Sequence, residues 1–434
     1  MVKKTRILTQ IPKGFKDILP EEQKYFEYIK ETARKHLQFS GFRHIDLPIL
    51  EYKSLFTRGV GEESEIVQKQ MFVVPRKSKS EEKEDYVLRP EGTASVARAY
   101  IEHGMHTRPQ PVMLYYIGPF FRYEQPQESR FREFWQIGAE ILGSDKPAAD
   151  VEVIRVLWDI LSDLGFSDMI LFINSIGCPN CRSNIEKALT EYFGLNKRRL
   201  CTDCKNRFKR NIFRILDCKN DKCIQIIKEA PPILDNLCVY CKNHLRKVLE
   251  SLDDLKIKYD LDPCLVRGFD YYTRTVFEIV SSEDKNRKSS LVGGGRYDNL
   301  VKLLGGPDTP AVGFALGIDR LAEIIKQKQI DVPDYEKPEI FLAQIGESAK
   351  RKSYEILKKL QGEGIPIKAS PYKDKLGAQL KTANRLKVKI TLIIGQKEVN
   401  DKTVIVRDMK EGVQEIVPQT DLVNLLKTKL KQKK

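Results

Sequence analysis

Eight of the nine cysteines gather in one part of the chain, at the spacing of metal ligands. They form the pairs Cys178-x2-Cys181, Cys201-x2-Cys204, Cys218-x4-Cys223 and Cys238-x2-Cys241. Four-cysteine zinc sites use paired spacings of this kind, and the first two pairs fit the pattern C-x2-C-x15–20-C-x2-C closely. Since eight thiolates are enough for two zinc ions, the spacing predicts structural zinc in this region.

The same cysteines have a second interpretation as packing residues. Because no secretory signal begins the chain, its nine cysteines are not expected to form a disulfide framework. A buried cysteine also behaves as a small hydrophobe. The region is long and weakly apolar, which favours a metal that contributes roughly 10 kcal/mol to folding. Both interpretations stay open at this point, while the isolated Cys264 is expected to be a packing residue.

Polar residues also interrupt segments that otherwise have the pattern of strands. Arg122 follows two phenylalanines where one such segment ends. In the next segment Gln136, Gly138 and Glu140 share one face, by the period of two. A half-buried strand would be apolar there, so these residues belong either to a site or to the wet face of an edge strand.

Two further segments combine glycine with arginine or tyrosine. One places Arg267, Tyr271 and Tyr272 inside a strand-like run, and the glycine run 293–295 offers backbone that a flat ligand could approach closely. Arg320 begins a helix after a glycine turn. Taken singly, a glycine run is more often a turn, tyrosines often pack in a core, and a helix arginine is often on the surface.

The elements expected to position these residues form an antiparallel sheet with helices. The runs 112–122 and 131–142 predict a long antiparallel hairpin around the polar loop 124–130. The other expected elements are a helix at 21–40, a strand at 44–47, strands at 71–74 and 86–89 around a solvated tip at 75–85, a helix at 147–165, a strand at 169–174, strands at 265–280 and 289–297, and a strand, glycine turn and helix at 310–326.

After Pro333 and Pro338 the pattern changes to an alternation of strands and helices. The expected order is strand 339–345, helix 347–361, strand 365–369, helix 374–386, strand 390–394, hairpin strands at 403–408 and 413–417, and helix 420–431. A compact sheet covered by helices is the natural packing for such an order. The proline-marked linker at 331–338 is therefore the best domain boundary.

The composition is that of a globular protein with unevenly placed charge. No run has the ~20 apolar residues of a membrane helix, and no secretory signal follows the basic start, so a cytoplasmic location is expected. The net charge is +15, and segments 175–250 and 337–434 each hold twice as many basic as acidic residues. Two basic modules fit a polyanion that binds across both, although a single charge run is usually solvated surface.

In combination, these segments resemble the signature motifs of class II aminoacyl-tRNA synthetases, and specifically of the bacterial-type histidyl-tRNA synthetase family. The matching segments are helix 21–40 with Leu47-Pro48 for motif 1, the hairpin for motif 2, residues 310–326 for motif 3, residues 88–94 for the amino-acid loop, and residues 265–278 and 293–298 for two segments peculiar to the histidine enzymes. The resemblance covers nearly the whole chain.

The resemblance implies an α+β catalytic domain on an antiparallel sheet at 1–330, followed by a linker at 331–338 and an α/β anticodon-binding domain at 339–434. A cysteine-rich insertion at about 176–258 is a candidate tRNA contact. The implied protein is a cytoplasmic homodimer that binds tRNA(His) and neither DNA nor membranes. It would activate L-histidine with ATP, accompanied by Mg²⁺, and then transfer it to the terminal adenosine of the tRNA; the family does not need zinc for this chemistry.

By the same resemblance, arginines hold the phosphates of ATP. Arg122 and Arg267 would grip the α-phosphate and Arg320 the γ-phosphate, with Arg130 as a further ATP ligand. Arginine suits these roles because its planar fork matches phosphate oxygens and stays charged. Negative charge develops at the α-phosphate in the transition state, so fixed cations there accelerate adenylate formation.

For the amino acid, the resemblance implies a polar pocket. Its members are Glu91 and Gln136 for the α-amino group with Gly92 and Thr93 beside them, Glu140 and Tyr272 for the imidazole, and Tyr271 and Tyr297 along the wall. A carboxylate and a phenol can satisfy both ring nitrogens. An analogue that lacks them would leave buried polar groups unpaired, which allows discrimination without editing.

The chain departs from the family in the motif 2 loop. Gln125, Glu128 and Ser129 stand where many relatives have arginine, lysine and glycine, and Trp135 replaces a usual histidine. This loop faces the acceptor end of the tRNA in the family. Gln127 and Arg132 are the candidates for that contact.

Two other functions are consistent with parts of the pattern. A regulatory paralogue would sense metabolites without charging tRNA, but such proteins lack the C-terminal domain and usually lose catalytic residues, both of which this chain keeps. A class II synthetase for another amino acid is opposed by the segments 265–278 and 293–298.

Overall fold

The computed structural model divides the chain into two compact units, Met1–Val332 and Pro333–Lys434, each described here by itself. It describes residues 9–61, 64, 66–75, 84–125, 131–281, 290–335 and 337–431. The expected hairpin tip at 75–85 and the loop at 124–130 lie largely outside these residues. Within the described ranges, no helix is long and apolar enough to cross a membrane.

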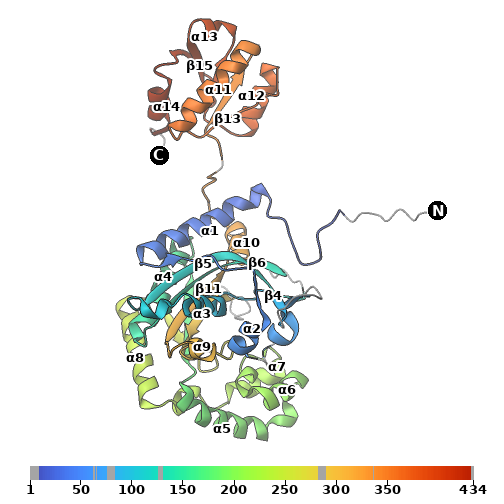
Figure 1. Cartoon of the computed structure of the whole chain (residues 1–434), viewed down its shortest axis with the longest axis vertical. Coiled ribbons are helices and arrows are strands. Elements are labelled where there is room, and N and C mark those ends of the chain that lie inside the picture. Colours follow the sequence, from blue (N-terminus) through green and yellow to red (C-terminus); the bar gives the residue numbers. More distant parts are fainter. Residues whose placement is uncertain are drawn as a thin grey trace, which may run out of the picture. The chain divides into compact units, whose positions relative to one another are not determined.

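An eight-stranded sheet forms the centre of the first unit (Figure 1). Its strands in spatial order are β1 (Arg43–His44), β5 (Val112–Phe121), β6 (Glu133–Leu142), β11 (Ala311–Gly317), β10 (Ser290–Arg296), β9 (Thr273–Ser281), β7 (Met169–Ser175) and β8 (Tyr259–Leu261). The pairs from β5 to β7 are antiparallel, and the two edge pairs, β1 with β5 and β7 with β8, are parallel. The predicted fold class is confirmed, with these parallel edges as an addition.

Helices pack on both faces of this sheet. One face shares a core with α1 (Pro20–Phe39), α4 (Pro147–Asp163) and α10 (Ile318–Gln327). The other shares a core with α2 (Lys53–Val60), α3 (Thr93–Glu102) and α9 (Leu300–Leu303). A second sheet contains β2 (Leu50–Tyr52), β4 (Tyr86–Leu88) and β3 (Phe72–Val74), and short helices η1 (Ile66–Gln70) and η2 (Met105–Thr107) complete this part.

The period of two in β6 decides which residues face each core. Ile137, Ala139 and Ile141 pack on the side of α1 and α4. Glu140 and Gln136 therefore point to the opposite side, where α3 lies. The sequence prediction that polar residues share one face of this strand is confirmed.

The predicted strand at 265–280 is wrong in its first half, because β9 begins only at Thr273. The preceding residues form a loop whose backbone bonds to other parts of the chain: the carbonyl of Gly268 accepts from Arg214 at 2.6 Å, and the amide of Asp270 donates to Val60 at 3.3 Å. Arg274 also has a left-handed φ of 49°, which interrupts a regular strand. We refer to residues 262–272 as the arginine–tyrosine loop.

The cysteine-rich insertion is a set of short helices with its own small core. They are α5 (Pro179–Leu195), η3 (Lys197–Arg199), α6 (Thr202–Arg210), η4 (Ile212–Ile215), α7 (Asp221–Lys228), η5 (Ile233–Asn236) and α8 (Val239–Asp254). In Figure 1 they are the green and yellow-green ribbons. All eight clustered cysteines belong to or pack against this core, and Cys264 packs against it as well.

The second unit is a five-stranded sheet with helices. Its strands in spatial order are β13 (Ile367–Ala369), β12 (Ile340–Gln344), β14 (Ile390–Ile394), β15 (Thr403–Asp408) and β16 (Gln414–Pro418). The first three are parallel and the last two pairs antiparallel. The helices are α11 (Glu347–Gly362), α12 (Leu376–Arg385), α13 (Gln396–Asn400) and α14 (Leu422–Lys431); the five-residue α13 was not predicted.

Candidate active site

A cavity of about 750 Å³ opens on the α3 side of the large sheet. Eleven of the residues predicted to bind ATP or histidine line it: Glu91, Gly92, Thr93, Arg122, Gln136, Glu140, Arg267, Tyr271, Tyr272, Tyr297 and Arg320. They come from segments up to 230 residues apart, which the sheet and the arginine–tyrosine loop bring together.

Glu140 is the centre of a buried hydrogen-bond network. Its carboxylate accepts from the hydroxyl of Tyr297 at 2.6 Å, from Thr93 at 2.9 Å and from Tyr116 at 3.4 Å. Burial raises the pKa of Glu140 to about 8, against the lowering effect of the bonds from Tyr297 and Thr93. A Cβ on the facing residue Gly313 would collide with this carboxylate, so glycine is required there.

Glu91 lies just before α3 and is also buried. Its carboxylate accepts from the backbone amides of Thr93 at 2.6 Å and Ala94 at 2.9 Å, the first free donors of the helix. Burial raises the pKa of Glu91, while these two amides lower it. The same residues that begin the helix therefore hold this carboxylate in the cavity wall.

Arg267 enters the cavity from the arginine–tyrosine loop. It forms an ion pair with Glu278 of β9, and its guanidinium lies 5.8 Å from the ring centroid of Tyr272. A Cβ at Gly293 would occupy the place of this guanidinium. The glycine run is thus part of strand β10 rather than a turn, and it leaves room for an arginine.

The other two arginines line the same cavity. The Nε of Arg122 donates to the carbonyl of Pro90 at 2.9 Å, and its guanidinium lies over the rings of Phe134 at 5.1 Å and Phe269 at 5.9 Å. Arg320 is in the first turn of α10. Three guanidinium groups in one cavity can bind a polyphosphate.

Gln136 and the paired tyrosines complete the polar wall. The side-chain oxygen of Gln136 is buried and, among the described residues, lacks a hydrogen-bond donor. Tyr271 and Tyr272 are buried with ring centroids 4.7 Å apart, and Tyr271 packs edge-on against Tyr297 at 5.6 Å. The cavity thus combines an unsatisfied acceptor with aromatic walls.

Tyr116 and Glu278 are among the cavity residues that the sequence analysis missed. Tyr116 bonds to Glu140, and Glu278 pairs with Arg267. A signal existed for both. Glu278 is the one charged residue between Val276 and Val280, and Tyr116 lies opposite Gly138 in the hairpin.

Of the two candidates for tRNA contact, Arg132 lies outside the cavity and Gln127 lies outside the residues that the structure describes. Arg132 does not line the cavity: its Nε donates to the carbonyl of Glu124 at 3.2 Å, and its guanidinium stacks on Tyr123 at 3.8 Å. Gln125 lines the cavity. Gln127, Glu128, Ser129 and Arg130 lie outside the described residues.

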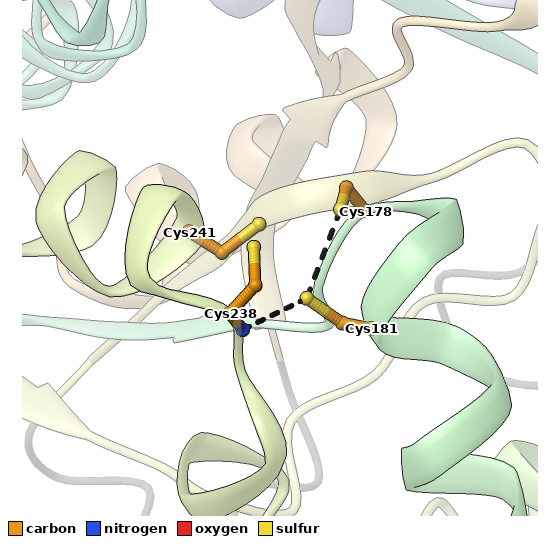
Figure 2. Close-up of side chains that lie close together, drawn as sticks. All are labelled: Cys178, Cys181, Cys238 and Cys241. Atoms are coloured by element: carbon orange, nitrogen blue, oxygen red, sulfur yellow. Dashed lines mark hydrogen bonds between the residues drawn. The ribbon is translucent and has the colours of Figure 1, made fainter.

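The eight cysteines form two separate groups. The first cysteine centre consists of Cys178, Cys181, Cys238 and Cys241, and the second consists of Cys201, Cys204, Cys218 and Cys223. In each group the four sulfur atoms lie within 4.8 Å of one another. Figure 2 shows the sulfurs of the first centre pointing toward one another from the starts of α5 and α8.

The first two pairs fit a zinc spacing pattern in the sequence, but they belong to different groups in the structure. Helix α5 has 17 residues and separates Cys181 from Cys201. Cys181 lies in its first turn, so at ~1.5 Å per residue roughly 20 Å of helix leads from Cys181 to the end of α5. The pair Cys178 and Cys181 instead joins the distant Cys238 and Cys241, while Cys201 and Cys204 join the following pair, Cys218 and Cys223.

Helix starts supply part of each cysteine centre. Cys178, Cys201 and Cys238 are the residues that cap α5, α6 and α8. The backbone amide of Cys241 lowers the pKa of Cys238 to about 7. A helix N-terminus favours the thiolate, which is the form that binds metals.

Comparison with known proteins identifies the two units. A family model described as histidyl-tRNA synthetase matches residues 14–197 and 210–321, and one described as anticodon binding domain matches residues 339–429. The gap between the first two segments contains Cys201 and Cys204.

Individual relatives cover almost the entire chain. The histidine–tRNA ligase of Desulforamulus reducens is 41% identical over 98% of this chain and 100% of its own, and that of Halothermothrix orenii is 43% identical over 95% and 97%. The apo histidyl-tRNA synthetase of S. aureus has a TM-score of 0.80 and 34% identity, and covers 96% of this chain and 99% of that one.

A mixed sheet of this kind, with a cavity lined by three arginines and a separate anticodon-binding unit, defines an aminoacyl-tRNA synthetase of class II. The family match and the relatives identify histidine as the amino acid: the chain belongs to the histidyl-tRNA synthetase family. It activates histidine with ATP and ligates it to tRNA(His). ATP is its substrate, and Mg²⁺ is expected to accompany the ATP.

Proposed function

We propose that the three cavity arginines carry out the activation step. Arg122 and Arg267 bind the α-phosphate of ATP, where negative charge develops, and Arg320 binds the γ-phosphate, with Arg130 as a further ATP ligand. The observation that supports this most is that Arg122, Arg267 and Arg320 line one cavity together with the buried network of Glu140. Removal of one such preorganised donor typically costs ~3–4 kcal/mol of transition-state stabilisation.

The same cavity is proposed to bind histidine by its two ends. Glu91 and the unsatisfied oxygen of Gln136 accept from the α-ammonium group, with Gly92 and Thr93 beside them. Glu140 and Tyr272 contact the two imidazole nitrogens. Tyr271 and Tyr297 form the wall, and Tyr297 also fixes the carboxylate of Glu140 through its 2.6 Å bond.

Pyrophosphate exchange tests this assignment. The full-length protein is incubated with ATP, labelled pyrophosphate and each amino acid in turn. Exchange with histidine alone is expected, because an amino acid without an imidazole leaves Glu140 and its partners unpaired in a buried site. Exchange with another amino acid, or none with histidine, would overturn the assignment.

We further propose that each cysteine centre binds a structural zinc ion. A tetrahedral ion with Zn–S bonds of ~2.3 Å separates its sulfurs by roughly 3.8 Å. The sulfurs of Cys178 and Cys181 are 3.7 Å apart and those of Cys201 and Cys218 are 3.9 Å apart, which supports this. The zinc ions would join helices of the insertion and take no part in the reaction.

The remaining assignments concern partners and organisation. We propose a cytoplasmic homodimer that joins through α1, where Phe39 is 81% exposed. The catalytic domain spans 1–330 with its insertion at about 176–258, and the linker 331–338 leads to the anticodon-binding domain at 339–434. The basic insertion is proposed to contact tRNA(His), and Gln127 and Arg132 are proposed to contact its acceptor end.

A further inference from the structure

The arginine–tyrosine loop lies outside the sheet, so strand pairing does not fix its position. It nevertheless carries Arg267 and Tyr272 into the cavity. Two of its polar contacts come from the cysteine-rich insertion. Asn211 Nδ2 donates to the carboxylate of Asp270 at 2.7 Å, and Arg214 Nη1 donates to the carbonyl of Gly268 at 2.6 Å.

Asn211 is itself held in one orientation. The side-chain Oδ1 of Asn211 accepts from the backbone amide of Phe213 at 3.1 Å. The backbone amide of Asn211 donates to the carbonyl of Arg207 at 2.8 Å. Because its oxygen is engaged on its own segment, its NH₂ group is directed at Asp270. The side chain is therefore a rigid strut between the insertion and the loop.

The segment that carries this strut is fixed at both ends. Cys201 and Cys204 begin α6 before it, and Cys218 follows it, all in the second cysteine centre. Apolar packing joins the two sides as well, since Val266 of the loop is buried in the same small core as Phe213. The insertion thus forms a support on which the loop rests.

We propose that Asn211 is a positioning residue for histidine activation: it acts through Asp270 to hold Arg267 and Tyr272 at the reacting groups. Asn211 does not line the cavity, whereas Arg214 does, so the role is assigned to Asn211. This inference rests on the roles proposed above for Arg267 and Tyr272. It gives the insertion a part in adenylate formation, a step that takes place without tRNA.

A charge swap tests the strut in the full-length protein. Asn211→Asp keeps an acceptor for Phe213 but sets a second carboxylate against Asp270. We expect kcat for histidine-dependent pyrophosphate exchange to fall roughly 10- to 100-fold, the cost of a small misplacement of catalytic groups. Adding Asp270→Asn restores a donor–acceptor pair in the opposite sense, and kcat should return to within about threefold of the unaltered protein.

The readout is kcat per active site, with sites counted by the burst of adenylate formation. Misfolding would lower the number of sites but leave kcat per site unchanged. Asn206→Asp is the matched control, because Asn206 is an exposed residue of α6, the helix that ends just before Asn211, and the change of charge is the same. It should leave kcat unchanged within about twofold.

Two results would overturn the inference: an unchanged kcat per site in Asn211→Asp, or a loss that the double variant does not repair. Arg267→Ala is measured alongside. If that variant keeps its exchange rate, the proposed role of Arg267 is wrong. If it loses exchange while Asn211→Asp does not, only the proposed positioning role of Asn211 is wrong.

Discussion

Glu140 is a carboxyl group that the fold keeps out of water. With its pKa at about 8 rather than the ordinary 4.5, the Glu140 carboxyl is protonated at neutral pH. Its contribution to the free energy of unfolding therefore falls as the pH rises from 4.5 toward 8. An imidazole N–H needs the ionised form. We therefore expect kcat/KM for histidine to rise as the pH increases through about 8.

Glu140→Gln should abolish the rise of kcat/KM for histidine near pH 8, because glutamine does not ionise. It should also lower kcat/KM roughly 10- to 100-fold, since a hydrogen bond to a charged group is replaced by a neutral one. Pyrophosphate exchange at varied histidine concentration, between pH 6 and about 9, measures both effects. An unchanged profile in this variant would assign the ionisation to another group.

The place of a single residue in the site could be predicted from the sequence where the residue belongs to a recognisable motif. Arg122, Glu140 and Tyr272 stand in segments that resemble a family, so their gathering could be anticipated. Tyr116 and Glu278 carried a signal in the sequence, but their partners could not be predicted, because these depend on strand register: Glu278 lies opposite Gly293, and this pairing lets it meet Arg267. Register is a long-range property that one strand does not carry by itself.

At the scale of elements, the cysteine centres decide how the insertion is held. Protein purified without added zinc should contain about two equivalents per chain. Cys238→Ser should reduce this to about one and lower the unfolding temperature, because the first centre loses a ligand. Cys264→Ser is the control, since Cys264 belongs to neither centre, and should retain both ions. Less than half an equivalent in the unaltered protein would contradict the proposal.

The spacing of these cysteines predicted that they bind zinc, but it did not predict which pairs share one ion. The grouping depends on α5, which begins beside Cys181 and leads the chain away from it before Cys201 is reached. The arginine–tyrosine loop shows the same limit. Its apolar and aromatic residues have the pattern of a strand, yet contacts to Arg214 and Val60 hold its backbone away from the sheet.

At the scale of the whole molecule, the proposed dimer makes a direct prediction. A solution mass measurement at micromolar concentration should give twice the 50.1 kDa of the chain. Phe39→Glu should shift the mass toward the monomer, because the exposed phenylalanine would be buried in the proposed interface and a charge there is left unpaired. A monomeric unaltered protein would contradict the proposed interface.

The central claim is that Arg267 acts on the phosphate in the transition state. Arg267→Ala should lower the rate of histidyl-adenylate formation by about 100- to 1,000-fold, while the Kd for histidine changes by less than about tenfold. Rapid mixing with ATP and histidine gives the first quantity, and equilibrium binding of histidine alone gives the second. A large loss of rate with nearly unchanged binding is the predicted result, and equal losses in both would contradict the account.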